Sequence, residues 1–407
     1  MFGFLTAVIV LLNCAAWNST AFCDWYIAYI FPIWVNTYGR ITGIFPFSVG
    51  EWLILAGVLL IAVAVLTGLF LIMTKIPGVL QNIRKQKGNT GSRRRSFYRF
   101  AKAFYRFFAW VLLVVCLIMT LNCQILYHAS TFSHQYFGKE EGNYTSVELF
   151  RLYNMVAGEC NRLAELVERD ETGMVTYIGA DGTEISTRYD DKWEKGLADM
   201  ADEARNLMKQ LGETYSQLDG WYPRPKAMLF SDFMCQQHMQ GYYFPFSMEA
   251  NYNDVMHILN IPSTMCHELA HLRGYIYEDE ANFIGYLACV ESEDNFFQYA
   301  GNLSVLNYLY NDMYKLWKTN PAVYEETAAV IQPIAVSEQV WEDNIFVSDA
   351  EWERINDKAI IDTEIVDKAA DAFIDTNLKV NGIADGKVSY SRVVTLLLQY
   401  YRQNEIK

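Results

Sequence analysis

The hydrophobic positions of this sequence form long uninterrupted runs in its first third. Residues 52–73 and 107–127 are uncharged and apolar, and each run is long enough to cross a bilayer as a helix. A shorter apolar run at residues 2–16 lacks the basic flank of a secretory signal, so we expect a first span there, with a signal sequence or a truncated start as alternatives. Residues 1–127 are therefore predicted to form a membrane region with two or three transmembrane helices.

After residue 128 the apolar positions recur at the spacing of amphipathic elements. Helical periodicity begins at Ser146 and extends to about Arg169, and it returns over residues 191–214. Asp181-Gly182 lies between two short β-prone runs, a pattern typical of a small hairpin. This part of the chain is therefore predicted to start with two long helices joined by a hairpin.

A small sheet and a second group of helices are predicted next. The β-prone pieces are residues 226–230 and 242–246, followed by residues 253–261. Pro262 can begin a helix because its missing N–H costs nothing in the first turn, and Gly274 suits the end of that helix. Further helices are expected at about 278–292, 295–317, 320–345, 363–377 and 388–402. The predicted fold class is α+β, with N-terminal transmembrane helices and a mainly helical domain that holds a small sheet.

The charges divide the chain in the same place. The loop between the two long apolar runs, residues 75–106, carries ten cations and no acid, and short cation-rich loops stay in the cytoplasm. We expect this loop to set the topology and to contact anionic head groups of the lipid bilayer. The protein is thus predicted to be a multi-pass protein of the cell membrane, with residues 128–407 forming one extracytoplasmic domain.

That domain is strongly acidic. Of the 47 Asp and Glu residues in the chain, only Asp24 and Glu51 precede residue 128. An excess of negative charge opposes binding to phosphate backbones, so nucleic acid is excluded as a partner. Its cysteines are not spaced like a zinc ribbon or a dense disulfide scaffold, although Cys266 and Cys289 could form a disulfide or remain buried thiols.

The chemistry is indicated by the run His267-Glu268-Leu269-Ala270-His271, an HExxH motif. Histidines four apart on a helix lie one above the other, so both imidazoles can bind one zinc ion. Glu268 is placed to take a proton from the water that zinc activates and to return it to the leaving amine. The alternative is a chance occurrence, with two solvated histidines on a surface helix.

A catalytic zinc ion requires a third protein ligand, and a new helix rich in acids begins shortly after Gly274. Here the sequence resembles the gluzincins, zinc peptidases whose second metal helix carries Glu, a small residue three positions on, and Asp or Asn four positions on. Glu278, Ala281 and Asn282 match this pattern. The resemblance implies that Glu278 is the third ligand and that Asn282 hydrogen-bonds a ligating histidine.

Glu280 is the alternative ligand, and only one of the two acids can face the metal because residues two apart on a helix point in nearly opposite directions. Two features depart from the gluzincin pattern. The stretch between His271 and Glu278 is shorter than in many gluzincins, and Gly274 also resembles the metzincin motif, although that motif requires a His where Tyr277 stands.

More closely, the segments PFSMEAN, HELAHLRG with EDEANFIGYLAC, and FQYAG resemble an uncharacterised bacterial family of membrane-anchored, zincin-like proteins, the domain of unknown function 3810 type. The resemblance covers most of the chain. It implies a zincin-like, gluzincin-type domain on membrane helices and a probable peptidase class, and it implies no particular substrate.

Tyr242, Tyr243 and Phe244 precede the motif at the place where zincins have an edge strand that pairs with an extended peptide. An ordinary core strand rich in aromatic residues is an equally good interpretation, and Pro245 favours an edge or a bend in both cases.

The function predicted is that of a membrane-anchored zinc metallopeptidase, with a peptide or protein substrate at the outer membrane surface. The cofactor is Zn²⁺, with His267, His271 and Glu278 or Glu280 as ligands and Glu268 as the general base. The alternative function is a non-catalytic extracytoplasmic sensor or scaffold that retains a zincin fold.

Overall fold

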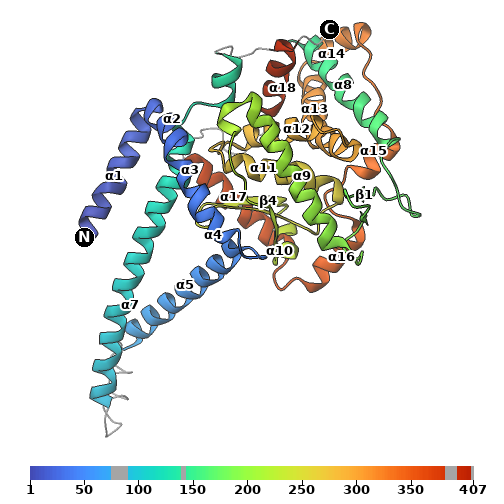
Figure 1. Cartoon of the computed structure of the whole chain (residues 1–407). Coiled ribbons are helices and arrows are strands. Elements are labelled where there is room, and N and C mark those ends of the chain that lie inside the picture. The colour runs from blue at the N-terminus through green and yellow to red at the C-terminus, as the bar shows by residue number, and fades with distance from the viewer. Residues whose placement is uncertain (75–89, 139–143, 381–391, 405–407) are drawn as a thin grey trace.

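The computed structural model describes residues 1–74, 90–138, 144–380 and 392–404. Within these residues the chain is mainly helical, with one two-stranded and one three-stranded sheet. Long helices near the N-terminus form an arm, and most of the remaining chain forms a rounded body at one end of it (Figure 1). The expectation of N-terminal apolar helices followed by a mainly helical part with a small sheet is confirmed at this level.

Two helical stretches of the described chain are long and apolar enough to cross a membrane. These are α5 (Val49–Met73) and the stretch Arg95–Phe137, which includes most of α7 (Thr90–Met119). Both contain the runs predicted as spans. α1 (Phe2–Asn18) satisfies the same criteria only together with the helical segment Thr20–Thr42, from which it is bent by 114°. Two helices, or three with this bent pair, can therefore span a membrane.

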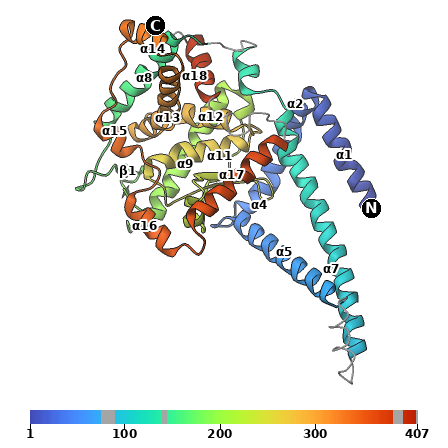
Figure 2. The ribbon, with the colours of Figure 1, turned by 180° about the vertical axis from the view of Figure 1, so that it is seen from behind.

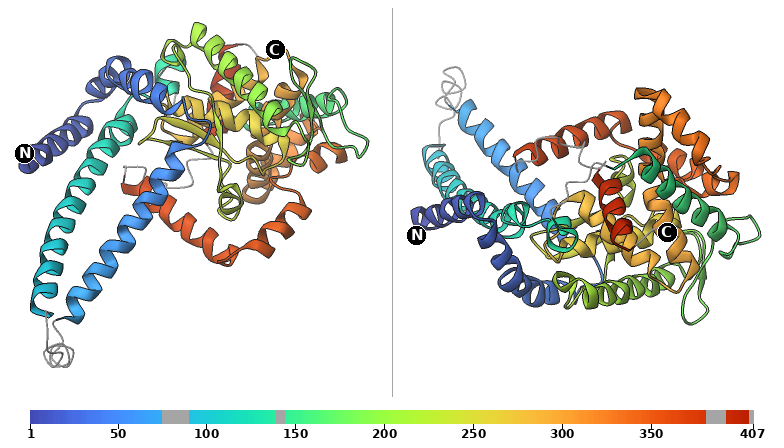
Figure 3. Two further views of the ribbon diagram at one scale, coloured as in Figure 1. Left: turned by 60° about the horizontal axis from the view of Figure 1, so that its bottom comes forward. Right: turned by 90° about the horizontal axis from the view of Figure 1, so that it is seen from above.

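α5 and α7 lie next to each other at the ends far from the body and diverge toward it (Figures 1 and 3). Tyr105 donates a hydrogen bond to the carbonyl of Ala64 at 2.7 Å, and the rings of Phe70 and Phe97 are 4.5 Å apart. Of the predicted basic loop, Lys75, Arg84, Lys85 and Lys87 lie outside the described residues, and the other cations lie on α7.

The segment between α1 and α5 is helical, which the sequence analysis did not predict. It contains α2 (Thr20–Tyr29), α3 (Phe31–Trp34), a π-helical turn (Val35–Gly39) and α4 (Arg40–Thr42). One side of it is buried against the rest of the protein, and the other side exposes aromatic rings. Its longest apolar run, residues 25–35, lies between Asp24 and Asn36 and is too short to cross a bilayer, so the search for spans could not reveal it.

The body is built from helices that largely match the predicted ones. They are α8 (Ser146–Ala164), α9 (Trp193–Thr214), α10 (Ser231–Cys235), α11 (Ile261–His271), α12 (Glu278–Val290), α13 (Asn295–Thr319), α14 (Pro321–Val330), α15 (Glu338–Asp343), α16 (Asp349–Lys358), α17 (Thr363–Val380) and α18 (Arg392–Gln403).

Two predicted helices differ from the structure, and two helices of the body, α10 and α16, were not predicted. α8 ends at Ala164, before Arg169. The helix expected over residues 320–345 is two helices, α14 and α15, because Pro333 in the connecting segment cannot donate a backbone hydrogen bond. α16 was not predicted; its N-terminus is capped by Ser348, whose hydroxyl accepts from the backbone N–H of Glu351.

The sheets are small and antiparallel except for one pairing. β1 (Tyr177–Ile178) and β2 (Glu184–Ile185) form the predicted hairpin around Gly182. In the second sheet the order is β3 (Lys226–Ala227), β5 (Glu249–Tyr252), β4 (Gly241–Phe244), with β5 parallel to β3 and antiparallel to β4. The third β-prone piece was predicted wrongly at 253–261: the strand is β5, and residues 258–260 form a 3₁₀ turn.

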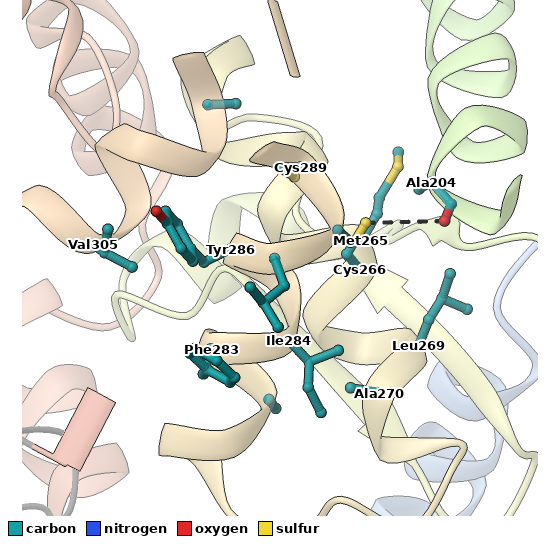
Figure 4. Close-up of a cluster of buried hydrophobic side chains, with 14 of the residues drawn as sticks. Ala204, Met265, Cys266, Leu269, Ala270, Phe283, Ile284, Tyr286, Cys289 and Val305 are labelled. Carbon is teal, nitrogen blue, oxygen red and sulfur yellow. Dashed lines mark hydrogen bonds between the residues drawn. The ribbon is translucent and has the colours of Figure 1, made fainter. Parts of the chain in front are cut away.

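The core of the body is formed by α11 and α12, which cross at its centre with α9 and α13 beside them (Figure 4). Their facing side chains, such as Leu269, Phe283 and Ile284, are fully buried. Cys266 and Cys289 are both buried and are free thiols, so no disulfide joins the two helices. Cys266 contacts the carbonyl oxygen of Ala204 at 4.0 Å instead.

The arm and the body are joined by buried polar contacts around Glu249. Its carboxylate accepts hydrogen bonds from the backbone N–H groups of Val49 and Gly50, at 3.1 and 2.8 Å, and from the ammonium of Lys226 at 2.5 Å. These N–H groups belong to the first turn of α5, which has no intrahelical acceptors for them. Close by, Glu51 accepts from the backbone N–H groups of Leu229 and Phe230, both at 2.9 Å.

A substitution at Gly50 would test the contact between the arm and the body, because a β-carbon placed on Gly50 would lie 2.7 Å from the ring of Phe244. Gly50→Ala should force the ring or the helix to move and should cost about 1–3 kcal/mol of stability. The matched control is Gly57→Ala in the same helix, where a β-carbon would meet nothing within 4 Å. Thermal unfolding of the full chain in detergent should show a Tm lower by several degrees for Gly50→Ala only. Equal Tm values for the two variants would contradict the tight contact.

Candidate metal site

The two histidines of the HExxH motif lie on α11, which is buried on nearly every side. Pro262 is in its first turn, as predicted, and the helix ends just before Gly274, which has a φ of +88°. A β-carbon on Gly274 would also lie 2.9 Å from Ile27, so glycine is required there both for the backbone turn and for the packing of α2. The sharp turn returns the chain so that α12 starts beside the end of α11.

Three side chains meet at this turn. The Nε2 atoms of His267 and His271 are 3.1 Å apart, and Glu278 Oε2 is 3.1 Å from the first and 4.0 Å from the second. Ligand atoms around a tetrahedral zinc ion, each about 2.0–2.1 Å from the metal, are separated by about 3.3 Å. The spacing of the three atoms is therefore close to that of a zinc ligand set.

The other ring nitrogens determine which protons the imidazoles carry. His271 Nδ1 donates to the carbonyl oxygen of Tyr275 at 2.6 Å, and His267 Nδ1 lies 2.9 Å from Asn282 Oδ1. Both partners are acceptors, so each Nδ1 carries a hydrogen and each neutral ring presents the Nε2 lone pair to the other. Two lone pairs and a carboxylate facing one another require a cation between them. The residues present therefore fit a zinc ion.

Asn282 is held in turn by its amide nitrogen, which donates to the hydroxyl of Tyr308 at 3.2 Å. The structure thus brings Asn282 to His267, as the gluzincin resemblance implied. Tyr308 and the carbonyl of Tyr275 were not found by the sequence analysis. A backbone carbonyl has no sequence signal, and Tyr308 is one of 27 tyrosines, so neither could have been selected.

Glu280 lies apart from the two histidines. It is 3% exposed, and its carboxylate accepts a hydrogen bond from the backbone N–H of Phe132 at 2.5 Å. Burial raises the pKa of Glu280 well above its usual range. Of the two alternative acids, the structure therefore places Glu278 beside the histidines, whereas Glu280 joins α12 to the end of the second long apolar segment.

Glu268, the acid of the motif, lies beside the histidines, and one of its carboxylate oxygens is within 4.8 Å of a ring nitrogen of each. Its Oε1 lies 3.9 Å from His267 Nε2, and its Oε2 is buried without a hydrogen-bond partner. Burial raises the pKa of Glu268 to about 8. A buried carboxyl group with a pKa near neutrality can accept and release a proton at physiological pH.

The three converging groups have unequal affinities for protons. Burial disfavours a charged His267, but its hydrogen bond to Glu278 outweighs this and raises the pKa of His267 to about 9. Burial and the neighbouring His267 lower the pKa of His271 to about 4. Burial opposes ionisation of Glu278 as well, yet the two histidines hold its pKa at about 2. Near pH 7 a single proton on His267 therefore takes the position that a metal ion would occupy.

Tyr242, Tyr243 and Phe244 lie in β4, which pairs only with β5 in its sheet. The ring of Tyr243 is mostly buried, 6.0 Å from the ring of His271, so its side chain belongs to the core. Its backbone amide, by contrast, interacts with the Glu268 carboxylate. A β-carbon on the neighbouring Gly241 would lie 2.7 Å from Glu268 Oε1, so glycine leaves room for that carboxylate. In the described residues β4 is therefore an edge strand of its sheet, and its Tyr243 side chain belongs to the core.

Comparison with known proteins identifies a family and nothing more specific. The family model described as "Protein of unknown function (DUF3810)" matches residues 26–398. This chain belongs to that family. The match begins within α2, so it covers α3, α4, α5 and α7 as well as the body. No curated protein and no solved structure matches the chain.

The zinc content of variants distinguishes the roles of Glu278 and Glu280. A zinc site on His267, His271 and Glu278 predicts that Glu278→Ala lowers zinc occupancy of the purified full chain at least tenfold, because one of three protein ligands is lost. Glu280→Ala should keep the zinc and lower the Tm, because it leaves the Phe132 N–H without its acceptor. Metal analysis by mass spectrometry and thermal unfolding measure both effects, and loss of zinc from Glu280→Ala alone would reverse the assignment.

The proton on His267 predicts how metal affinity depends on pH. Because the pKa of His267 is raised to about 9, zinc must displace a proton below that pH, and affinity should rise by up to about tenfold per unit from pH 6 to pH 8. His271, with a pKa of about 4, is already neutral in this window. Competition with a chelator at each pH measures the affinity. A flat profile would mean that His267 is not a ligand.

Proposed function

We propose that this chain is a membrane-anchored zinc metallopeptidase. The observation that carries the proposal is the convergence of two imidazole Nε2 atoms and one carboxylate whose outer hydrogen bonds leave their lone pairs directed at one point. Such a set is costly to bury without a cation, and nitrogen and oxygen donors at this spacing suit zinc. Three protein ligands leave one coordination position open, which is typical of catalytic rather than structural sites.

Zinc bound here would supply a Lewis acid that polarises a carbonyl group and makes water more acidic. Glu268 would move the proton: its carboxylate takes one from the attacking water and gives it to the nitrogen of the leaving amine. Its raised pKa of about 8 and its unpartnered Oε2 support this role, because a strongly solvated carboxylate would be a weaker base. A structural metal site would have no use for such a group.

The free edge of β4 would hold the peptide. Backbone groups along an unpaired strand bind an extended chain without regard to its side chains, and this edge starts next to Glu268. His267 is 13% and Glu278 31% exposed at the side chain, so the site is reached by solvent on the Glu278 side. The zincin-like, gluzincin-type classification of the body is part of this proposal.

The proposed location is the cell membrane, with the body on the extracytoplasmic side. Arg95, Arg99, Lys102 and Arg106 lie in the part of α7 that is far from the body, and positive charge next to a span favours the cytoplasmic side. α5 and α7 would then cross the bilayer and carry the body at its outer surface.

The test uses the full chain, because the arm packs on the sheet beside the site. The purified protein should contain one zinc per chain and should cleave members of a randomised soluble peptide library, detected by mass spectrometry. Glu268→Gln should keep its zinc and lose at least about a thousandfold in rate, since the isosteric amide cannot accept the proton. His267→Ala should lose both the zinc and the activity.

Zinc retention with equal peptide hydrolysis by Glu268→Gln would remove Glu268 from the mechanism. One zinc per chain without hydrolysis of any peptide would favour a non-catalytic sensor or scaffold. Absence of zinc from the unaltered protein would make the HExxH sequence a coincidence.

A further inference from the structure

We propose that the substrate of this site is a polypeptide anchored in the same membrane by an N-terminal transmembrane helix, and that it is cut within about ten residues of the point where it leaves the bilayer. This inference rests on the proposed peptidase function and narrows it to a class of substrate. It follows from the course of β4 between the site and the membrane helices.

The backbone of β4 has hydrogen-bonding groups next to the site that do not pair with β5. Asn253 N–H donates to the carbonyl of Gln240 at 2.7 Å, so the pair Gln240–Asn253 is hydrogen-bonded. Because bonded and non-bonded pairs alternate in an antiparallel ladder, Gly241 and Tyr243 are the non-bonded positions of β4. Their N–H and C=O groups point away from β5, toward the side on which Glu268 lies. The Tyr243 N–H interacts with the Glu268 carboxylate, so a bound peptide would pair with the N–H and C=O of Gly241 and with the C=O of Tyr243.

From this point β4 runs directly to the ends of the two long apolar helices. The ring of Phe244 packs on Gly50 in the first turn of α5, and Asn122, at the body end of the α7 stretch, donates to the carbonyl of Pro245 at 2.7 Å. The hydroxyl of Tyr243 also contacts the carbonyl of Asn122, at 3.3 Å. The strand therefore ends between the body ends of α5 and α7, as Figure 3 shows.

The same place has the features of a membrane interface. Large aromatic side chains are exposed along the helices that connect α1 with α5 and at the start of α5 itself. They include Trp25, Tyr29, Trp34, Tyr38, Phe47 and Trp52. Tyrosine and tryptophan are enriched at the boundary between hydrocarbon and water, where an amphipathic ring is favourable. The end of β4 thus lies at the level where a chain would emerge from the bilayer.

The first turns of α5, beside β4, also expose an apolar surface. Only 6% of the most apolar part of α5 is buried, and its contacts with α7 are at Ala64 and beyond, far from the body. Nearer the body the two helices diverge (Figures 1 and 2). The part of α5 near the body exposes large apolar side chains, among them Trp52, Leu55 and Leu59. A helix with an apolar surface is the occupant that matches them.

The direction of β4 selects the end by which the substrate is anchored. β4 runs from Gly241 near Glu268 to Phe244 near α5, that is, toward the membrane. Antiparallel pairing, which is the more frequent and slightly more stable arrangement, requires the substrate to run from the membrane toward the site. The residues on the N-terminal side of the cut would then lead into the bilayer. At about 3.3 Å per residue, the distance along β4 corresponds to only a few residues.

The experiment uses the full chain reconstituted in phosphatidylethanolamine–phosphatidylglycerol vesicles, with Glu268→Gln as the inactive control. Each reporter carries the same randomised twelve-residue segment next to a folded soluble domain. In the first reporter the segment directly follows an N-terminal transmembrane helix, and in the second a linker of thirty Gly/Ser residues separates that helix from the segment. The third reporter is anchored by a C-terminal transmembrane helix instead of an N-terminal one. The fourth, soluble reporter has no transmembrane helix. Cut sites are identified by sequencing the released fragments.

We expect the first reporter to be cut at least tenfold faster than the soluble one, within about ten residues of the helix, and at least as fast as the spaced form. Faster cutting of the spaced or soluble reporter would show that the site opens away from the membrane, which overturns this inference and leaves the peptidase function intact. Equal cutting of the C-terminally anchored reporter would overturn the direction of binding. Cutting of none of the four would overturn the proposed function and this inference together.

Discussion

The buried carboxylate of Glu249 connects every part of this structure that bears on function. It is 1% exposed and accepts hydrogen bonds from the first turn of α5 and from Lys226, which in turn donates to the backbone carbonyls of Thr42 and Phe47. A buried carboxylate without partners is very unfavourable, and removing one partner of such a pair typically costs about 3–5 kcal/mol. The helix α5, the helical segment of residues 20–42 and the central strand β5 are therefore held in one arrangement.

That arrangement determines the position of the candidate site relative to the bilayer. Glu249 lies in β5, and β5 holds β4, whose backbone contacts Glu268 on α11. The turn after α11 also contacts the arm, because Gly274 packs closely against Ile27 of α2. The site is thus built against the membrane arm, and the arm is part of the enzyme's scaffold in our proposal. A body cut off at residue 127 would lack both contacts.

Inside the site the constraint is electrostatic. The hydrogen bonds from His267 and His271 to Asn282 and Tyr275 direct two lone pairs at one point, and Glu278 adds negative charge there. Without a metal ion, a proton on His267 relieves the repulsion between these lone pairs and the carboxylate. The pKa of His267 is therefore raised, while the pKa of His271 is lowered. The same groups that favour a proton would favour a divalent cation more strongly, since the charge is doubled.

The sequence alone determined the long apolar helices, most helices of the body, and the identity of His267, Glu268 and His271, because length, periodicity and an i,i+4 spacing are local properties. It left Glu278 and Glu280 as alternatives and missed the helices of residues 20–42, the strand β5 and the contacts of Tyr275 and Tyr308. These features depend on which segments, distant from one another in the sequence, pack together in the folded chain. Only the tertiary structure decided that Glu280 bonds Phe132 while Glu278 joins the histidines, and that β4 runs from the site to the body ends of α5 and α7. The physical reason is that burial and hydrogen-bond partners, which choose between chemically identical carboxylates, are properties of the packed chain and not of its local order.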